Sequence, residues 1–177
     1  MDILSLLREQ VRDAHEWVEA TVADVTAEQA RWIPQGVANP LGATYAHMVV
    51  GEDNIVNGLL KGSAPLQAGA WAGKTGVSQT MPMPGPDWPQ YPAWTRSVQI
   101  DLPALKKYAQ AVYAATDQYL ASLAPADLDR MVDFGPMGLD KRPVSWVVSR
   151  LVFAHVEDCC GEISALKGLQ GAKGYPM

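Results

Sequence analysis

Apolar side chains recur every three or four residues in several long stretches of the chain, which is the period of one face of an α-helix. This pattern predicts helices over roughly residues 2–24, 40–60, 102–123 and 143–167. In the first of them the repeating positions are Ile3, Leu7, Val11, Ala14, Val18, Thr21 and Val25. Four amphipathic helices of this length favour an all-α fold, and specifically a four-helix bundle.

Residues that favour helix ends and turns support these boundaries. Asp101 is the expected N-cap of the third helix, and Pro125 ends it. Thr26 and Gln29 have the spacing of a capping box, which predicts a short helical turn after the first helix. The segment 131–142 carries Gly-Pro and Met-Gly turn signals, and we expect a small hairpin or an irregular loop there.

The segment 61–100, between the second and third helices, is rich in proline and tryptophan. Loops longer than about 12–15 residues are uncommon unless they are functional or disordered, and tryptophan is costly to leave in water. We therefore expect an ordered crossover, folded over one end of the bundle. Two interpretations stay open, a lid over a pocket or a connection whose tryptophans fill the core. These tryptophans are Trp71, Trp88 and Trp94.

Composition and charge limit the class of protein. A chain of 177 residues is long enough for a single domain over 1–177 with a substantial core. The net charge of -5 and the lack of a Lys/Arg cluster argue against nucleic acid and acidic membrane surfaces as partners. No apolar run is long enough to span a bilayer, and the N-terminal stretch is typical of an amphipathic helix and not of a signal peptide. The two cysteines are adjacent, so reduced thiols and a cytoplasmic location are expected.

The sequence HVEDCCGEI, residues 155–163, concentrates side chains that can bind metals. His155 and Cys159 are four residues apart, so they share one face of the last helix with aliphatic residues. Cys160 is turned about 100° away and is expected to pack. Imidazole nitrogen and thiolate sulfur suit zinc, whereas geometry and availability decide between zinc, nickel and iron.

A third ligand can come from the second helix, at His47. Its neighbours on the helical wheel, among them Gly51, are small or polar, which leaves room for an open ligand position and a pocket. By the same wheel Glu52 and Asp53 point away, toward solvent or a helix edge. His15 lies at the margin of the first apolar stripe, and we expect it at the surface.

Each of these side chains also has a purely structural interpretation. A lone histidine on an apolar face is usually a packed and hydrogen-bonded core residue, and a buried cysteine behaves as a small hydrophobe. The trio His47, His155 and Cys159 is therefore a hypothesis that rests on the three side chains meeting at one point.

The stretches TYAHMVVGED and HVEDCCGEISALKGLQGAKGYP resemble the DinB/YfiT-like family of bacterial four-helix-bundle proteins. That family pattern has one histidine on the second helix, matched by His47, and two histidines four apart on the last helix. His155 matches the first of these two, and Cys159 occupies the position of the second. Gly161 and Glu162 match the glycine and the acidic or amide residue that follow. The resemblance covers nearly the whole chain in the order and length of its helices.

The resemblance implies an up-down-down-up bundle, often dimeric, with a three-ligand divalent metal centre open to a pocket. The metal in the family is typically zinc or nickel, and Glu162 would be either a hydrogen-bond partner of a ligand or a solvated or capping residue. Characterised relatives include metal-dependent transferases and isomerases that use bacillithiol, mycothiol or glutathione. A thiolate at position 159 would bind zinc well but would weaken the power of the ion to activate a nucleophile.

Three functions are compatible with these residues, and whether the protein is an enzyme stays open. The first is a metal-dependent thiol transferase or hydrolase that acts on a small molecule, with a low-molecular-weight thiol as substrate and a homodimer as assembly. No catalytic side chain is assigned. The second is a non-catalytic small-molecule-binding or stress-related protein whose degenerate site holds no metal. The third is a redox sensor at Cys159 and Cys160, which lack the spacing of a C-x-x-C motif.

Overall fold

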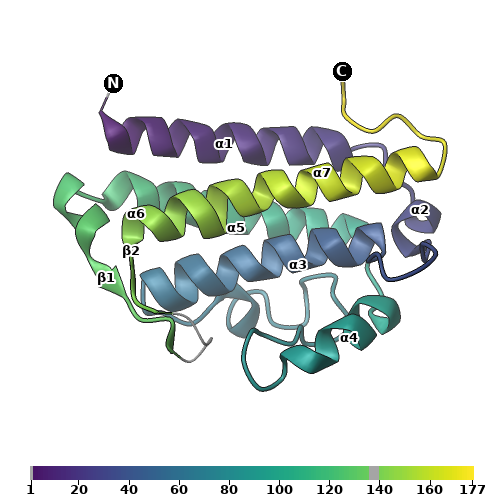
Figure 1. The fold of residues 1–177 in the computed structure, drawn as a ribbon, viewed down its shortest axis with the longest axis horizontal. Coiled ribbons are helices and arrows are strands. Elements are labelled where there is room, and N and C mark those ends of the chain that lie inside the picture. Colours follow the sequence, from purple (N-terminus) through teal and green to yellow (C-terminus); the bar gives the residue numbers. More distant parts are fainter. Residues whose placement is uncertain (1, 136–139) are drawn as a thin grey trace.

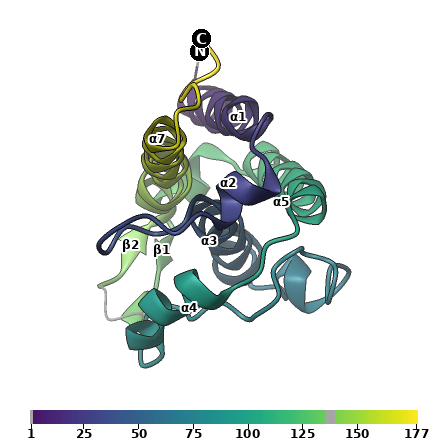
Figure 2. The same cartoon turned by 90° about the vertical axis from the view of Figure 1, so that its right-hand side faces the viewer.

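The computed structural model describes residues 2–135 and 140–177. Four long helical rods lie side by side, which confirms the expected all-α four-helix bundle (Figures 1 and 2). The rods are α1 (Ile3–Val22), α3 (Leu41–Asp53) with the π-helix Asn54–Leu60, α5 (Leu102–Ser122), and α6 (Val144–Trp146) with the π-helix Val147–Phe153 and α7 (Ala154–Leu169). These ranges match the four predicted from the apolar period.

The expected helix ends are also present. The side chain of Asp101 accepts a hydrogen bond from the backbone N–H of Ala104 and so caps α5. Thr26 and Gln29 form the predicted capping box at the start of the short helix α2 (Ala27–Arg31). These side chains satisfy N–H groups that have no partner within the helix, which fixes where each helix begins.

Short elements connect the rods. The crossover contains the 3-10 turns Leu66–Ala68 and Trp88–Gln90 and the helix α4 (Tyr91–Ser97), and the 3-10 helix Pro125–Asp129 follows α5. The strands β1 (Met131–Val132) and β2 (Arg142–Pro143) pair antiparallel, as a hairpin at 131–142 would require, while its turn at 136–139 lies outside the described residues. None of the helices in the described ranges is long and apolar enough to cross a membrane.

The helix α3 occupies the middle of the fold. It contacts α7, α5, α2 and α4, and nearly all of its side chains are buried (Figure 2). Apolar residues lie on all sides of α3 and not on one face, because a helix that is covered on all sides needs no polar face. A polar group on α3 therefore costs free energy unless it finds a partner inside the protein.

The crossover 61–100 runs along the side of α3 that faces away from α1 (Figures 1 and 2). It covers a flank of the bundle and not its end, which corrects the expectation from the sequence. Trp94 is buried, and Trp71 packs against Tyr108 with ring centroids 5.7 Å apart, whereas Trp88 is 38% exposed. The tryptophans thus divide between the core and a surface close to the candidate site described below.

Asp53 anchors the start of this crossover. Its carboxylate is completely buried and accepts hydrogen bonds from the hydroxyl of Tyr108 (2.5 Å) and from the backbone N–H groups of Leu66 (2.9 Å) and Gln67 (3.0 Å). The prediction that Asp53 points to solvent or a helix edge was wrong, because the wheel assumed a solvated side that α3 lacks. The same carboxylate joins α3, α5 and the crossover.

We expect Asp53→Ala to destabilise the protein by about 3 kcal/mol, because it leaves the donors of α5 and of the crossover without an acceptor. Urea denaturation followed by circular dichroism measures the change. Asp13→Ala removes an exposed carboxylate from α1 and serves as the control, with an expected change below about 0.5 kcal/mol. Equal stability of the two variants would contradict the anchoring role of Asp53.

Candidate metal centre

The helices α3 and α7 bring the three predicted ligands together. His47 comes from α3, and His155 and Cys159 come from consecutive turns of α7. The Nε2 atoms of His47 and His155 are 3.1 Å apart, and Sγ of Cys159 lies 3.6 Å from Nε2 of His155. The three donor atoms all lie within 4.8 Å of one another.

The distances suit a tetrahedral ion. Bonds of about 2.0 Å to nitrogen and 2.3 Å to sulfur place two nitrogens about 3.3 Å apart, and a nitrogen and a sulfur about 3.5 Å apart. The two close donor pairs of this cluster are near these values, and small side-chain movements would bring the third pair into range. Nδ1 of His47 is buried and has no hydrogen-bond partner among the residues described. The two facing nitrogens and their soft sulfur neighbour are therefore a donor set that a divalent metal would fit.

Burial sets the protonation of these donors. It lowers the pKa of His47 to about 4, an effect to which the nearby His155 adds, and it also lowers the pKa of His155. Burial raises the pKa of the Cys159 thiol to about 12, with further contributions from the carboxylates of Glu162 and Asp158. At neutral pH both imidazoles are thus neutral and ready to bind a metal, while position 159 carries a thiol. A metal that binds Cys159 as thiolate must first displace this proton.

Gly51 keeps the two helices close at the site. A Cβ atom at this position would lie 3.9 Å from Cε1 of His155, so the α3 backbone directly faces the imidazole. The small side chains that the helical wheel predicted around His47 are thus present at Gly51. The crossover fills another part of that face, since a Cβ on Gly58 would contact Pro65 at 3.4 Å, and Asn54 donates a hydrogen bond to the sulfur of Met83.

Aromatic residues of the crossover flank the donors. The ring of Tyr91 meets His47 edge-on at 5.1 Å between centroids, and Trp88 stacks on Tyr91 at 4.4 Å. Burial raises the pKa of the Tyr91 phenol, with Cys159 and Glu162 adding to the shift, so the hydroxyl stays protonated at neutral pH. Tyr91 was not among the residues predicted from the sequence. The only signal for it was the clustering of aromatic residues in a proline-rich segment.

The remaining residues of the motif on α7 have structural roles. Cys160 is buried beside the hydroxyl of Thr21 (3.5 Å), as its predicted packing role requires. Gly161 leaves room for Tyr175, because its Cβ would lie 3.6 Å from that hydroxyl, and Tyr175 also packs against Trp17. The C-terminal segment therefore folds back over α7 and α1. Glu162 is exposed.

His15 and Glu52 do not lie at the surface, which corrects two further expectations. His15 is 6% exposed and Glu52 only 1%, and Nε2 of His15 lies 2.9 Å from Oε2 of Glu52. The apolar stripe of α1 underestimates its buried face, because α1 packs against both α5 and α7. These two residues form a second polar cluster, apart from the three candidate ligands.

Both thiols are buried, and burial raises the pKa of each. A thiol that senses oxidants needs thiolate character and solvent access. The structure therefore gives no support to the redox-sensor interpretation of Cys159 and Cys160.

Comparison with known proteins identifies the relatives of this fold. The family model of the DinB superfamily matches residues 7–157. The crystal structure of a conserved protein from Enterococcus faecalis is similar over 95% of this chain and 99% of that chain, with a TM-score of 0.73 and 23% sequence identity. This likeness concerns the fold alone. The comparison with curated proteins gave no match.

We expect the metal-free protein to lose stability as the pH falls from 6.5 toward about 4. In this window the unfolded chain binds a proton at His47 and the folded chain does not, so each pH unit costs up to about 1.4 kcal/mol. Urea denaturation with a chelator at several pH values measures the slope. His47→Leu cannot bind this proton, so its slope should be shallower; a slope equal to that of the original protein would refute the shift.

Proposed function

Because its match to the family model spans residues 7–157, the chain belongs to the DinB superfamily, and we propose that it binds a divalent metal ion through His47, His155 and Cys159. On this proposal the protein is a metal-dependent enzyme that acts on a small molecule, as a thiol transferase or a hydrolase. A low-molecular-weight thiol is the substrate that best fits the expected family chemistry.

The apposition of two neutral imidazoles carries this proposal. The Nε2 atoms of His47 and His155 face each other at 3.1 Å, although both sit in an environment that opposes a charge on either ring. Without an ion, one Nε2 must donate a proton to the other, so only one of the two facing lone pairs is used. An ion between the rings would use both lone pairs, and it would offset the cost of burying them.

The donor set favours zinc, with nickel as the second choice. Two imidazoles and one sulfur are typical of zinc sites, and a catalytic zinc keeps three protein ligands and one open position. When bound, the ion would lower the pKa of a thiol or a water molecule at the site.

Side chains of the crossover would position the substrate. The protonated hydroxyl of Tyr91 can donate a hydrogen bond to a group bound beside His47. Trp88, which is 38% exposed and stacked on Tyr91, offers an apolar face to the same ligand. The combination suits a molecule that has an apolar part next to its reacting group.

Metal content tests the site directly. We expect about one equivalent of zinc or nickel in protein supplied with the metal, and less than a tenth of an equivalent in His47→Ala or His155→Ala, because two remaining ligands bind weakly. Elemental analysis after dialysis measures the ratio. His15→Gln is the matched control, since it removes a histidine outside the cluster and should keep the metal.

If the original protein itself holds less than a tenth of an equivalent after zinc or nickel is supplied, the proposed centre is wrong. Circular dichroism spectra that match the original protein are required of each variant, so that a lost metal is not mistaken for a lost fold.

The raised pKa of Cys159 favours one alternative, a binding protein whose degenerate site has lost its metal chemistry. Cys159→His distinguishes the two functions, because an imidazole binds at neutral pH without losing a proton. If the protein is an enzyme, Cys159→His should retain or gain metal affinity and thiol transferase activity. Cys159→Ser, which is similar in size to the original residue, is the control. Variants and original protein that all lack both properties would favour the binding protein.

A further inference from the structure

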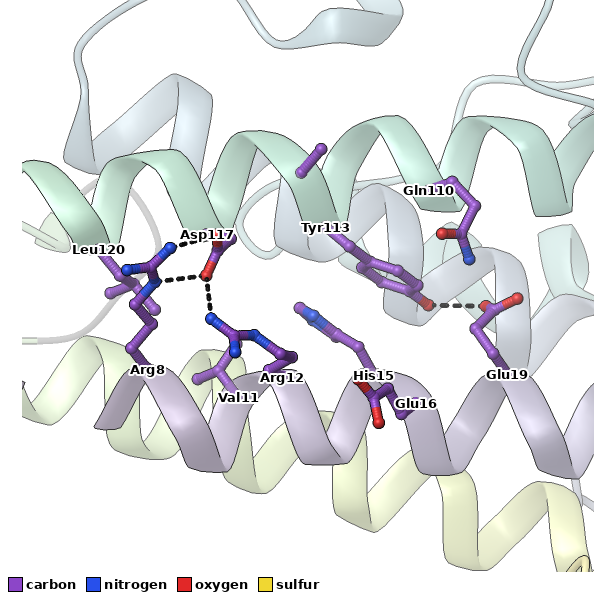
Figure 3. Close-up of a pocket in the computed structure, with 11 residues that line it drawn as sticks. Arg8, Val11, Arg12, His15, Glu16, Glu19, Gln110, Tyr113, Asp117 and Leu120 are labelled. Atoms are coloured by element: carbon purple, nitrogen blue, oxygen red, sulfur yellow. Dashed lines mark hydrogen bonds and ion pairs between the residues drawn. The ribbon is translucent and has the colours of Figure 1, made fainter. Parts of the chain in front are cut away.

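A groove runs between α1 and α5, and it shares none of its lining residues with the candidate metal centre. Its volume is about 340 Å³. Figure 3 shows its lining, in which Arg8, Arg12, His15 and Glu19 follow one another along α1 and face Tyr113 and Asp117 on α5. The metal donors belong to α3 and α7, whereas the residues that line the groove belong to α1 and α5.

One lining residue of the groove, His15, belongs to a buried acid–imidazole pair. Nε2 of His15 lies 2.9 Å from Oε2 of Glu52, and the hydroxyl of Thr116 donates to Oε1 of the same carboxylate at 2.6 Å. The carboxylate thereby fixes the orientation of the imidazole. His15 is nine-tenths buried and lines the groove, and its second nitrogen, Nδ1, has no hydrogen-bond partner within residues 2–135 and 140–177. A ligand in the groove could bind this free nitrogen.

Glu19 provides a carboxylate beside this pair. Its Oε1 accepts hydrogen bonds from the hydroxyls of Tyr45 (2.5 Å) and Tyr113 (3.1 Å), and the ring of Tyr113 stacks on His15 at 3.8 Å (Figure 3). Burial and the charge of Glu19 raise the pKa of both phenols, so they remain donors. These contacts hold Glu19 in place through one oxygen and leave Oε2 for another donor.

The charges of the groove are unevenly paired. Arg8 binds Asp117 through both carboxylate oxygens, at 2.6 and 2.7 Å, and Arg12 approaches the same carboxylate at 3.4 Å. The arginines hold the pKa of Asp117 at about 2. In the part of the chain that the structure describes, neither Glu16 nor Glu19 has a salt-bridge partner. The groove thus has an unneutralised acidic half next to His15.

We propose that this groove binds a small organic cation, an ammonium or guanidinium compound, between His15 and Glu19. The cation would donate hydrogen bonds to Oε2 of Glu19 and to Nδ1 of His15, and Glu16 at the rim would add a favourable charge. In the same groove, the guanidinium of Arg8 already binds the carboxylate of Asp117, which is the type of contact proposed for the ligand. A small anion is less favoured, because both arginines are already engaged by Asp117.

Methylguanidinium chloride is the probe that tests this site, since a guanidinium ion is a poor metal ligand and so reports on the groove alone. Nuclear magnetic resonance of the imidazole groups follows binding, because the chain has only three histidines. We expect a saturable shift of the His15 signals, with or without a chelator, and little change at His47 and His155.

Two variants and a matched control test whether the cation binds in the groove. Glu19→Gln keeps an acceptor for the two phenols but removes the charge, and should weaken binding at least tenfold. Ala114→Leu fills the groove from an exposed position and leaves every polar group in place, and should abolish binding. Glu9→Gln, an exposed charge on the same helix outside the groove, should bind as the original protein does.

The proposal would be overturned if the His15 signals shifted linearly with methylguanidinium chloride and shifted as far with sodium chloride. It would also be overturned if Glu19→Gln bound methylguanidinium as tightly as the original protein. Saturation by sodium acetate instead of methylguanidinium would also overturn it and would assign an anion to Arg12. None of these results depends on metal content, so the groove and the metal centre can fail separately.

Discussion

The burial of α3 on every side is the constraint on which the rest of the structure depends. A helix in the middle of a bundle cannot send polar side chains to water, and each buried polar group costs free energy unless it is paired. The chain nonetheless places His47, Glu52 and Asp53 on α3, and each has a hydrogen-bonding partner on a neighbouring element. These three pairings contribute to the candidate metal centre, to the His15 pair beside the groove and to the attachment of the crossover.

The three pairings differ in how completely they are satisfied. Asp53 is saturated by a phenol and two backbone N–H groups, which is what a structural anchor requires. Glu52 is paired with His15 and Thr116, although Nδ1 of the imidazole has no partner within the described ranges 2–135 and 140–177. His47 is the least satisfied, because it faces a second neutral imidazole and its Nδ1 has no partner among the described residues. The hydrogen bonds of Asp53 are thus complete, whereas a ligand could add to those of His47 and His15.

The sequence predicted the fold and the candidate ligands because both depend on local periodicity. An apolar repeat gave the four rods, and a separation of four residues placed His155 and Cys159 on one face of a regular helix. The meeting of His47 with this pair was a hypothesis from the helical wheel to which the family resemblance added, and the three donors lie together in the packing of α3 against α7. Glu52, Asp53 and His15 could not be placed in this way, since a helical wheel presumes a solvated side. The protonation of Cys159 and the position of Tyr91 depend on tertiary contacts that no local pattern encodes.

An ion held between the α3 and α7 rods is the central claim. Crystals grown with zinc, with diffraction data collected on both sides of the zinc absorption edge, would locate it. We predict one anomalous peak bonded to Nε2 of His47, Nε2 of His155 and Sγ of Cys159, at about 2.0–2.3 Å. Fully occupied zinc elsewhere on the protein, with the two imidazoles still in direct contact and no peak between them, would contradict it.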